Sequence, residues 1–311
     1  MSPLFEYAPA PESREVARLK ASYQLFVNGG FRDGTGEESK HPLHVHFVAG
    51  VNRFRNLDYD SGHFHGHASG SFFRTDVLER EQIRFDPRLR TVFEDGHFCN
   101  VYLLRVPEPL VGYVSTATYK YRKRDDGSST LDRSWMDPGR FTNALEHGLL
   151  DLLQAGAKRS GRAPTWLQGM VLYELFWYFR TDARMYAPTV GYGEVNKRFH
   201  ELFDQICDLL DEQGIDSYFA TRYQPAWRDI LLHGRFDEPW HTDHAVVDKL
   251  DSKQNLMRVT YRFTGELPDE MFVVYSGRVQ PVHQKIRDLT FFGRTMLYER
   301  IVWVPFGSIV R

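Results

Sequence analysis

Four consecutive segments with apolar residues at helical spacing lie between residues 137 and 233, and they constrain the fold more than any other feature of the sequence. The first segment follows Asp137-Pro138, which is a typical helix N-cap and first helical position. The other three segments begin, in chain order, near Pro164, Val195 and Pro225. Gly214 is a natural residue to follow the end of the third helix. The pattern therefore predicts an all-α module of roughly a hundred residues.

The segments on either side of this helical module have different patterns. The run HVHFVAG at residues 44 to 50 alternates and predicts a strand, and HASGSFF at residues 67 to 73 predicts a strand that leads into a short helix. From residue 254 onward, β-rich runs are separated by turn residues. We therefore expect a mixed α+β fold with three domains: a partial α/β portion over 1–135, a helical extension over 136–240 and a small antiparallel β unit over 241–311.

Charge and cysteine content narrow the class of protein. The formal net charge is -2, so the basic excess that nucleic-acid binding requires is missing. Cys99 and Cys207 lie in apolar patterns, which is typical of a reduced cytosolic protein. The N-terminal residues do not resemble a signal peptide. The most apolar window, MVLYELFWYF, is interrupted by Glu174 and is too short to span a bilayer.

Glu94 and Asp95 stand directly before an apolar segment, FCNVYLL, that predicts a helix of the core. Carboxylates in a first helical turn are favoured by the helix dipole without any chemistry. A general base, however, also needs a carboxylate that can reach a substrate hydroxyl. The pair alone is compatible with both roles.

The surrounding residues resemble the acceptor-side half of family 2 glycosyltransferases, which have a GT-A fold. The matching positions in FFRTDVLEREQIRFDPRLRTVFEDGHF are Phe73-Arg74, Ile83, Phe85, Asp86, Leu89, Glu94 and Asp95. Downstream, VGYVSTATYKYRKRDDGSST resembles the closing strand and the basic-serine loop of that family. Over most of residues 20–311, and most strongly over 67–180, the chain resembles actinobacterial proteins that join such a transferase to a CDP-glycerol glycerophosphotransferase module.

This resemblance implies inverting transfer of a sugar from a nucleotide sugar to a cell-envelope polysaccharide or a teichoic-acid-like acceptor. Asp95 would be the catalytic base, and Glu94 would either orient the acceptor or help to hold the loop. Residues that would contact the donor diphosphate are Arg122, Lys123, Arg124, Ser128 and Ser129. Residues that would lie on the acceptor side are His67, Arg74, His97 and Trp135. The stretch RKRDDGSS is also typical of a solvated turn.

The family also implies a nucleotide-binding half that ends in an Asp-x-Asp motif holding Mn²⁺ or Mg²⁺. No strand followed by a glycine-bearing turn and a helix precedes residue 40, and Asp58-Tyr59-Asp60 follows a polar flank instead of a buried strand. We therefore expect a truncated enzyme of the hexosyltransferase class, active when completed by a donor-binding half, with its metal ligands not found in this sequence. The expected partners are the nucleotide sugar and the polymer acceptor, and the expected location is the cytoplasm, at the inner face of the membrane through its substrate.

Two other interpretations stay open. The first is a non-catalytic remnant that binds a glycan or a protein partner. The second is a cupin-like metal-binding protein, because His63, His65 and His67 alternate and would share one face of a strand at a spacing that suits a metal. The helical centre of the chain argues against a regular all-β metal-binding fold.

Overall fold

The computed structural model describes residues 42–60, 62–90, 92–117, 134–184, 193–235 and 238–310, and the backbone of strands β1 (Leu25–Val27) and β2 (Gly30–Arg32). The chain divides into two compact units, one formed by Met1–Arg53 with Tyr113–Arg122 and the other by Phe54–Gly112 with Lys123–Arg311. In the first unit, β1 and β2 form an antiparallel pair. All the elements of the candidate site lie in the second unit.

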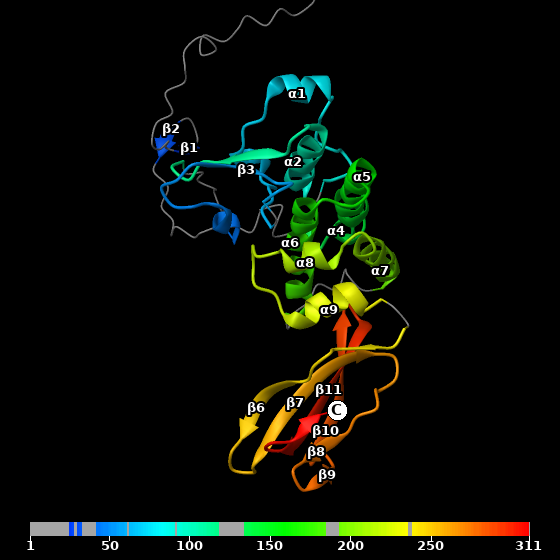
Figure 1. Cartoon of the computed structure of the whole chain (residues 1–311). Helices are drawn as coiled ribbons and strands as arrows, with labels where there is room; N and C mark the ends of the chain where they lie inside the picture. The colour runs from blue at the N-terminus through cyan, green and yellow to red at the C-terminus, as the bar shows by residue number, and fades with distance from the viewer. Residues whose placement is uncertain are drawn as a thin grey trace, which may run out of the picture. The chain divides into compact units, whose positions relative to one another are not determined.

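The second unit contains a helical part and a β-rich part (Figure 1). Its described helices are α1 (Thr75–Arg80), α2 (Glu94–Arg105), α4 (Pro138–Phe141), the π-helix η4 (Ala144–Leu150), α5 (Asp151–Ser160), α6 (Thr165–Asp182), α7 (Glu194–Cys207), α8 (Glu212–Asp216) and α9 (Pro225–His233). Helix α6 is buried along most of its length. No helix in the described part of the chain is long and apolar enough to cross a bilayer.

The predicted helix starts are confirmed. Asp137 caps α4 by accepting a hydrogen bond from the Gly139 amide at 2.7 Å, and Pro138 and Pro225 are the first residues of their helices. The predicted role of Gly214 is wrong, because α7 already ends at Cys207 and Gly214 lies inside α8. The Asp211 side chain accepts a hydrogen bond from the Gly214 amide at 2.7 Å, and this cap begins a new helix.

Two predicted strands are replaced by short 3₁₀ helices. Residues Pro42–His46 form η2, which begins at a proline and turns the His46 ring toward Tyr113, with 6.0 Å between the ring centroids. Residues Ala68–Gly70 form η3, which His67 caps with its side chain. In both segments the local turn residues outweigh the alternation. The predicted short helix after the second segment is confirmed as α1.

The β-rich part contains two antiparallel sheets. The larger one consists of β5 (Trp240–His241), β6 (Val246–Asp251), β7 (Leu256–Thr264), β10 (His283–Phe291) and β11 (Arg294–Pro305). Its order is β10-β11-β7-β5, and β6 also pairs with β7. The smaller sheet consists of β12 (Ile309–Val310), β8 (Phe272–Val274) and β9 (Gly277–Val279). A further two-stranded sheet joins β3 (Arg53–Asn56) to β4 (Leu110–Tyr113).

An aromatic core joins the larger sheet to the helices. The Phe291 ring stacks on Phe179 of α6 with 4.1 Å between the centroids, and Phe292 contacts Phe199 of α7. Arg262 of β7 forms an ion pair of 2.5 Å with the buried Asp229 of α9. The mixed α+β class is therefore confirmed, whereas the domain boundaries after residues 135 and 240 stay predictions.

Candidate active site at the start of helix α2

Glu94 and Asp95 form the first turn of α2, as predicted, and the residue before them has an unusual backbone. Phe93 has a φ of 72°, in the left-handed region. Such a conformation costs about 1–3 kcal/mol for a residue with a side chain and persists only where the surroundings hold it. Here the buried phenyl ring lies against two glycines, because a Cβ would lie 2.4 Å from the ring at Gly96 and 2.8 Å from it at Gly148. The lodged ring therefore fixes the direction in which α2 begins.

A loop from a different part of the chain lies beside Asp95. The Ser69 hydroxyl donates to Asp95 Oδ2 at 3.5 Å, and the same Oγ lies 3.1 Å from His67 Nε2. His67 Nδ1 accepts a hydrogen bond from the Gly70 amide at 3.1 Å. Since Nδ1 is an acceptor, we assign the proton of the neutral ring to Nε2, which donates to Ser69. The Ser69 proton then points to Asp95 Oδ2, and no hydrogen bond within the described part of the chain involves Asp95 Oδ1.

The half-buried His65 forms a hydrogen bond within this loop, and the buried Asn100 holds the loop on α2. His65 Nε2 lies 2.6 Å from the Ser71 hydroxyl, which itself donates to the His67 carbonyl at 2.5 Å. Burial, assisted by the neighbouring His67, lowers the pKa of His65 to about 4, so its ring is neutral at physiological pH. The Asn100 amide donates to the His65 carbonyl at 3.1 Å and to the Gly96 carbonyl at 2.6 Å. The loop and the helix therefore form one hydrogen-bonded assembly.

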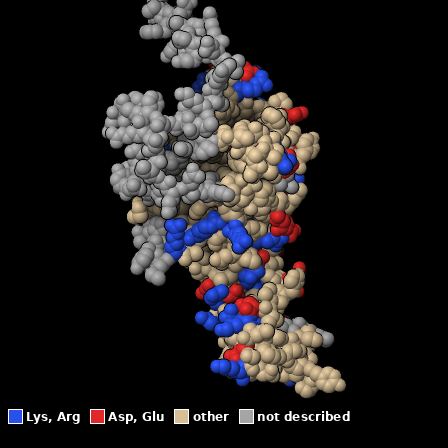
Figure 2. All heavy atoms as spheres, turned by 90° about the vertical axis from the view of Figure 1, so that its left-hand side faces the viewer, with Lys and Arg blue, Asp and Glu red and all other residues tan. Residues whose placement is uncertain are grey.

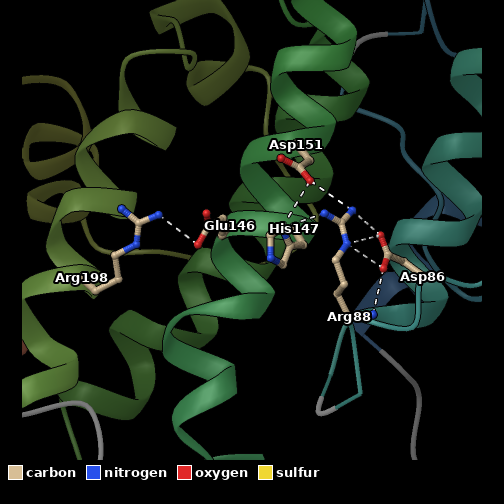
Figure 3. Close-up of polar contacts among 6 residues, drawn as sticks. All are labelled: Asp86, Arg88, Glu146, His147, Asp151 and Arg198. Carbon is tan, nitrogen blue, oxygen red and sulfur yellow. Dashed lines mark hydrogen bonds and ion pairs between the residues drawn. The ribbon is translucent and has the colours of Figure 1, made fainter.

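A network of ionic side chains supports the segment that leads into Phe93 (Figure 3). Arg88 donates to both carboxylate oxygens of Asp86, with Nη2 2.6 Å from Oδ2 and Nε 3.0 Å from Oδ1. Its guanidinium also lies 3.2 Å from His147 Nδ1 and 3.5 Å from Asp151 Oδ2. Hydrogen bonds from Arg88 lower the pKa of Asp86 to about 2. The network ties the residues before α2 to the helices that contain Gly148 and Asp151.

Glu174 of α6 is a third acidic residue near the start of α2, besides Glu94 and Asp95. It lines a crevice too tight to hold a water molecule, together with Val92, Phe93, Ala144, Leu149 and Tyr178. Burial raises the pKa of Glu174 to about 7, with an opposing effect of Arg140 and a further increase from Glu94. The side chain keeps some exposure to solvent. The sequence does contain a sign of this residue, since Glu174 is the acid that interrupts the most apolar window.

Three other residues predicted to lie on the acceptor side have different surroundings. Arg74 is exposed and donates to both carboxylate oxygens of Asp76, at 3.1 and 2.7 Å. His97 is buried in α2, where its Nδ1 has no hydrogen-bond partner among the described residues, and burial lowers its pKa. Trp135 is half-buried and stacks on the Arg140 guanidinium, whose central carbon is 3.5 Å from the ring centroid. Hence the structure brings only His67 close to Asp95, and the functional roles of all these residues stay predictions.

The predicted diphosphate-binding residues lie outside the described residues. They are Arg122, Lys123, Arg124, Ser128 and Ser129. No spacing or motif pointed to Ser69 or Asn100, because single small polar residues in a loop or a helix are too common to be informative.

The described residues do not fit a metal site. Among them, no group of three or more His, Cys, Asp or Glu side chains could hold a metal ion. The His63 ring packs on Phe219 at 5.3 Å, and both His65 and His67 form the hydrogen bonds given above. The Asp58 carboxylate accepts from Trp166 Nε1 at 2.9 Å, and Asp60 pairs with Arg55 at 3.3 Å. We therefore assign no metal ligand, and the His-rich alternative gains no support.

Two curated proteins are similar to this chain. It is 27% identical over 201 residues to the minor teichoic acid biosynthesis protein GgaA of Bacillus subtilis (strain 168), a match that covers 64% of this chain and 43% of the relative. It is 27% identical over 142 residues to the minor teichoic acid biosynthesis protein GgaB of the same strain, which covers 46% of this chain and 15% of that relative. The matches thus span less than half the length of either relative. No family model and no solved structure matches the chain.

Proposed function

We propose that this protein takes part in the synthesis of a teichoic-acid-like cell-envelope polymer, as the acceptor-side part of an inverting glycosyltransferase. The similarity to two minor teichoic acid biosynthesis proteins supports the process. The observation that carries the proposed chemistry is the position of Asp95, which lies in the first turn of α2 with Ser69 and His67 beside it.

In the proposed reaction, Asp95 acts as the general base. Its Oδ1 accepts the proton of the acceptor hydroxyl as the hydroxyl oxygen attacks the anomeric carbon of the donor sugar. The bond from that carbon to the nucleoside diphosphate breaks from the opposite side, so the configuration inverts. Ser69 donates a hydrogen bond to Oδ2 and thereby orients the Asp95 carboxylate. Glu94, the exposed residue before Asp95, contacts the acceptor.

The resemblance implies a Mn²⁺ or Mg²⁺ ion on the donor diphosphate, where it would offset negative charge. Because no set of described residues fits such an ion, we derive no step through it. The diphosphate contacts of Arg122 to Ser129 remain part of the proposal.

The proposal is tested by measuring sugar transfer and nucleoside diphosphate release with UDP- and CDP-linked sugars, with and without Mn²⁺, and with poly(glycerol phosphate) as the acceptor. We expect Asp95→Asn to lower kcat by about 10²–10⁴-fold, which is the usual contribution of a general base. Glu94→Gln should change the KM for the acceptor more than kcat. Glu79→Gln, a change at an exposed carboxylate of α1, is the matched control and should behave like the wild type.

Two outcomes contradict the proposal. Turnover that survives Asp95→Asn would remove Asp95 as the base. Polymer binding without any turnover of the tested donors would favour the alternative of a non-catalytic glycan-binding protein.

A further inference from the structure

The larger C-terminal sheet has one face that packs on the protein core and one that is turned away from it. The inner face contributes Met257, Val259, Val302 and Val304 to a hydrophobic cluster with Phe272. Because side chains alternate along a strand, their neighbours in sequence lie on the outer face.

The strand register aligns basic and aromatic residues across this outer face. Lys249 pairs with Arg258, Arg258 with Trp303, and Trp303 with His283, so these four residues form one row across β6, β7, β11 and β10. Lys285 lies two residues after His283 and on the same face. Lys249 Nζ is 5.9 Å from the Trp303 ring centroid, and the Arg258 guanidinium carbon is 6.0 Å from it. The half-buried indole is thus flanked by two cations.

Some of the charges on this face are already paired. Arg258 donates to both oxygens of Asp248, at 2.7 and 2.8 Å, and Arg287 pairs with Glu299. Lys249 and Lys285 are exposed, and neither forms an ion pair with any described residue. Figure 2 shows basic side chains, with a few carboxylates among them, over the C-terminal strands. The unpaired lysines lie on opposite sides of Trp303, so the face offers two separated positive charges with an aromatic surface between them.

The dimensions of the row exclude a small ligand as the occupant of the whole face. The Cα atoms of Lys249 and His283 are three strand spacings apart, or about 14 Å. The Cα atom of Lys285 lies about 7 Å further along the strand of His283. A ligand that reaches both lysines must therefore carry negative charges at separate points. It must also present an uncharged, CH-rich segment to the indole, since the Trp303 ring offers no charge of its own.

We propose that this outer face binds a polymer of sugars or polyols linked by phosphodiesters, which rests on the proposed function because such a polymer is the acceptor assumed there. Phosphates of separate repeats contact Lys249 and Lys285, and the sugar or polyol between them packs on Trp303. The face holds the growing polymer and does not take part in the chemistry at Asp95.

The test is the affinity of the full chain for end-labelled poly(glycerol phosphate), measured by fluorescence anisotropy at low and high salt. Lys249→Ala and Lys285→Ala should each weaken binding about two- to fivefold, as expected for an exposed ion pair, and the loss should shrink at high salt. Trp303→Leu should weaken binding about fivefold or more at either salt concentration. Circular dichroism of this variant checks that the sheet is intact. Glycerol phosphate alone should compete poorly, because it cannot reach both lysines at once.

Lys197→Ala is the matched control, since Lys197 is an exposed lysine of helix α7 without an ion pair to any described residue. Equal effects of Lys197→Ala and Lys249→Ala would overturn the inference, as would equally tight binding of polyglutamate or single-stranded DNA. The binding result is independent of the transfer assay: if the wild type binds the polymer and the three variants bind it more weakly, but the wild type transfers no sugar, only the proposed function fails. If transfer occurs but the three variants bind like the wild type, only the assignment of this face fails.

Discussion

The contact between Phe93 and Gly96 gives a prediction whose sign depends on the structure. Gly96 lies in α2, where alanine is favoured over glycine by about 1 kcal/mol. Helix propensity alone therefore predicts that Gly96→Ala stabilises the protein. In the structure, however, the new Cβ would lie 2.4 and 2.7 Å from two carbons of the Phe93 ring. The ring has little room to move away, because Gly148 lies on its other side and the ring is buried.

Overpacking of this kind costs about 1–3 kcal/mol. The cost outweighs the gain in propensity of about 1 kcal/mol, so we expect Gly96→Ala to lower the free energy of unfolding by up to about 2 kcal/mol. In a Phe93→Ala background the ring is absent and only the propensity remains. There, Gly96→Ala should raise the free energy of unfolding by about 1 kcal/mol.

Urea denaturation followed by tryptophan fluorescence measures both effects, with the slope m compared among variants to check that the transition is the same. Phe93→Gly replaces Phe93→Ala if the latter does not fold, since glycine also lacks the ring and readily adopts the positive φ of this position. The reasoning is refuted if Gly96→Ala stabilises the wild type, or if it has the same effect with and without the ring.

Three further predictions concern polar side chains that are buried or half-buried. Glu174→Gln should stabilise the protein by about 1–3 kcal/mol at pH 8 and by little at pH 5, as measured by denaturation at both pH values. The reason is the raised pKa of Glu174, about 7, because of which the wild type loses stability as the pH rises from about 4.5 through 7. Asp86→Asn should cost about 1–2 kcal/mol at pH 7, after allowance for the exposed Arg88, and the difference from wild type should disappear as the pH falls from about 4 to 2. Asn100→Ala should lower the free energy of unfolding by about 1–2 kcal/mol, measured by urea denaturation. The carbonyls of His65 and Gly96 lose a buried donor, while an Oδ1 that has no hydrogen-bond partner among the described residues is removed.

Much of the candidate site could be predicted from sequence wherever the signal is local. The carboxylates before FCNVYLL predicted the start of a helix, and α2 begins at Glu94. His67 was predicted on the acceptor side, and its ring is linked to Asp95 through the Ser69 hydroxyl, which contacts both side chains. Ser69 and Asn100 could not be predicted, because their importance comes from contacts with residues that are distant in sequence.

Local signals determined the class and order of the elements. Proline and aspartate at helix starts act within one turn of the backbone, so Asp137, Pro138 and Pro225 mark their helices without help from the rest of the chain. Alternation was weaker, since a strand needs a neighbouring strand to satisfy its backbone, and the segments at residues 42–46 and 68–70 instead form 3₁₀ turns.

Only the tertiary structure decided how the functional groups meet. The left-handed Phe93, its lodging between Gly96 and Gly148, and the approach of Ser69 to Asp95 all depend on packing between segments that are far apart in the sequence. The row formed by Lys249, Trp303 and His283 depends in the same way on strand register, which is set by pairing between strands. The sequence thus determined which residues can carry the chemistry, and the packing determined which of them lie together.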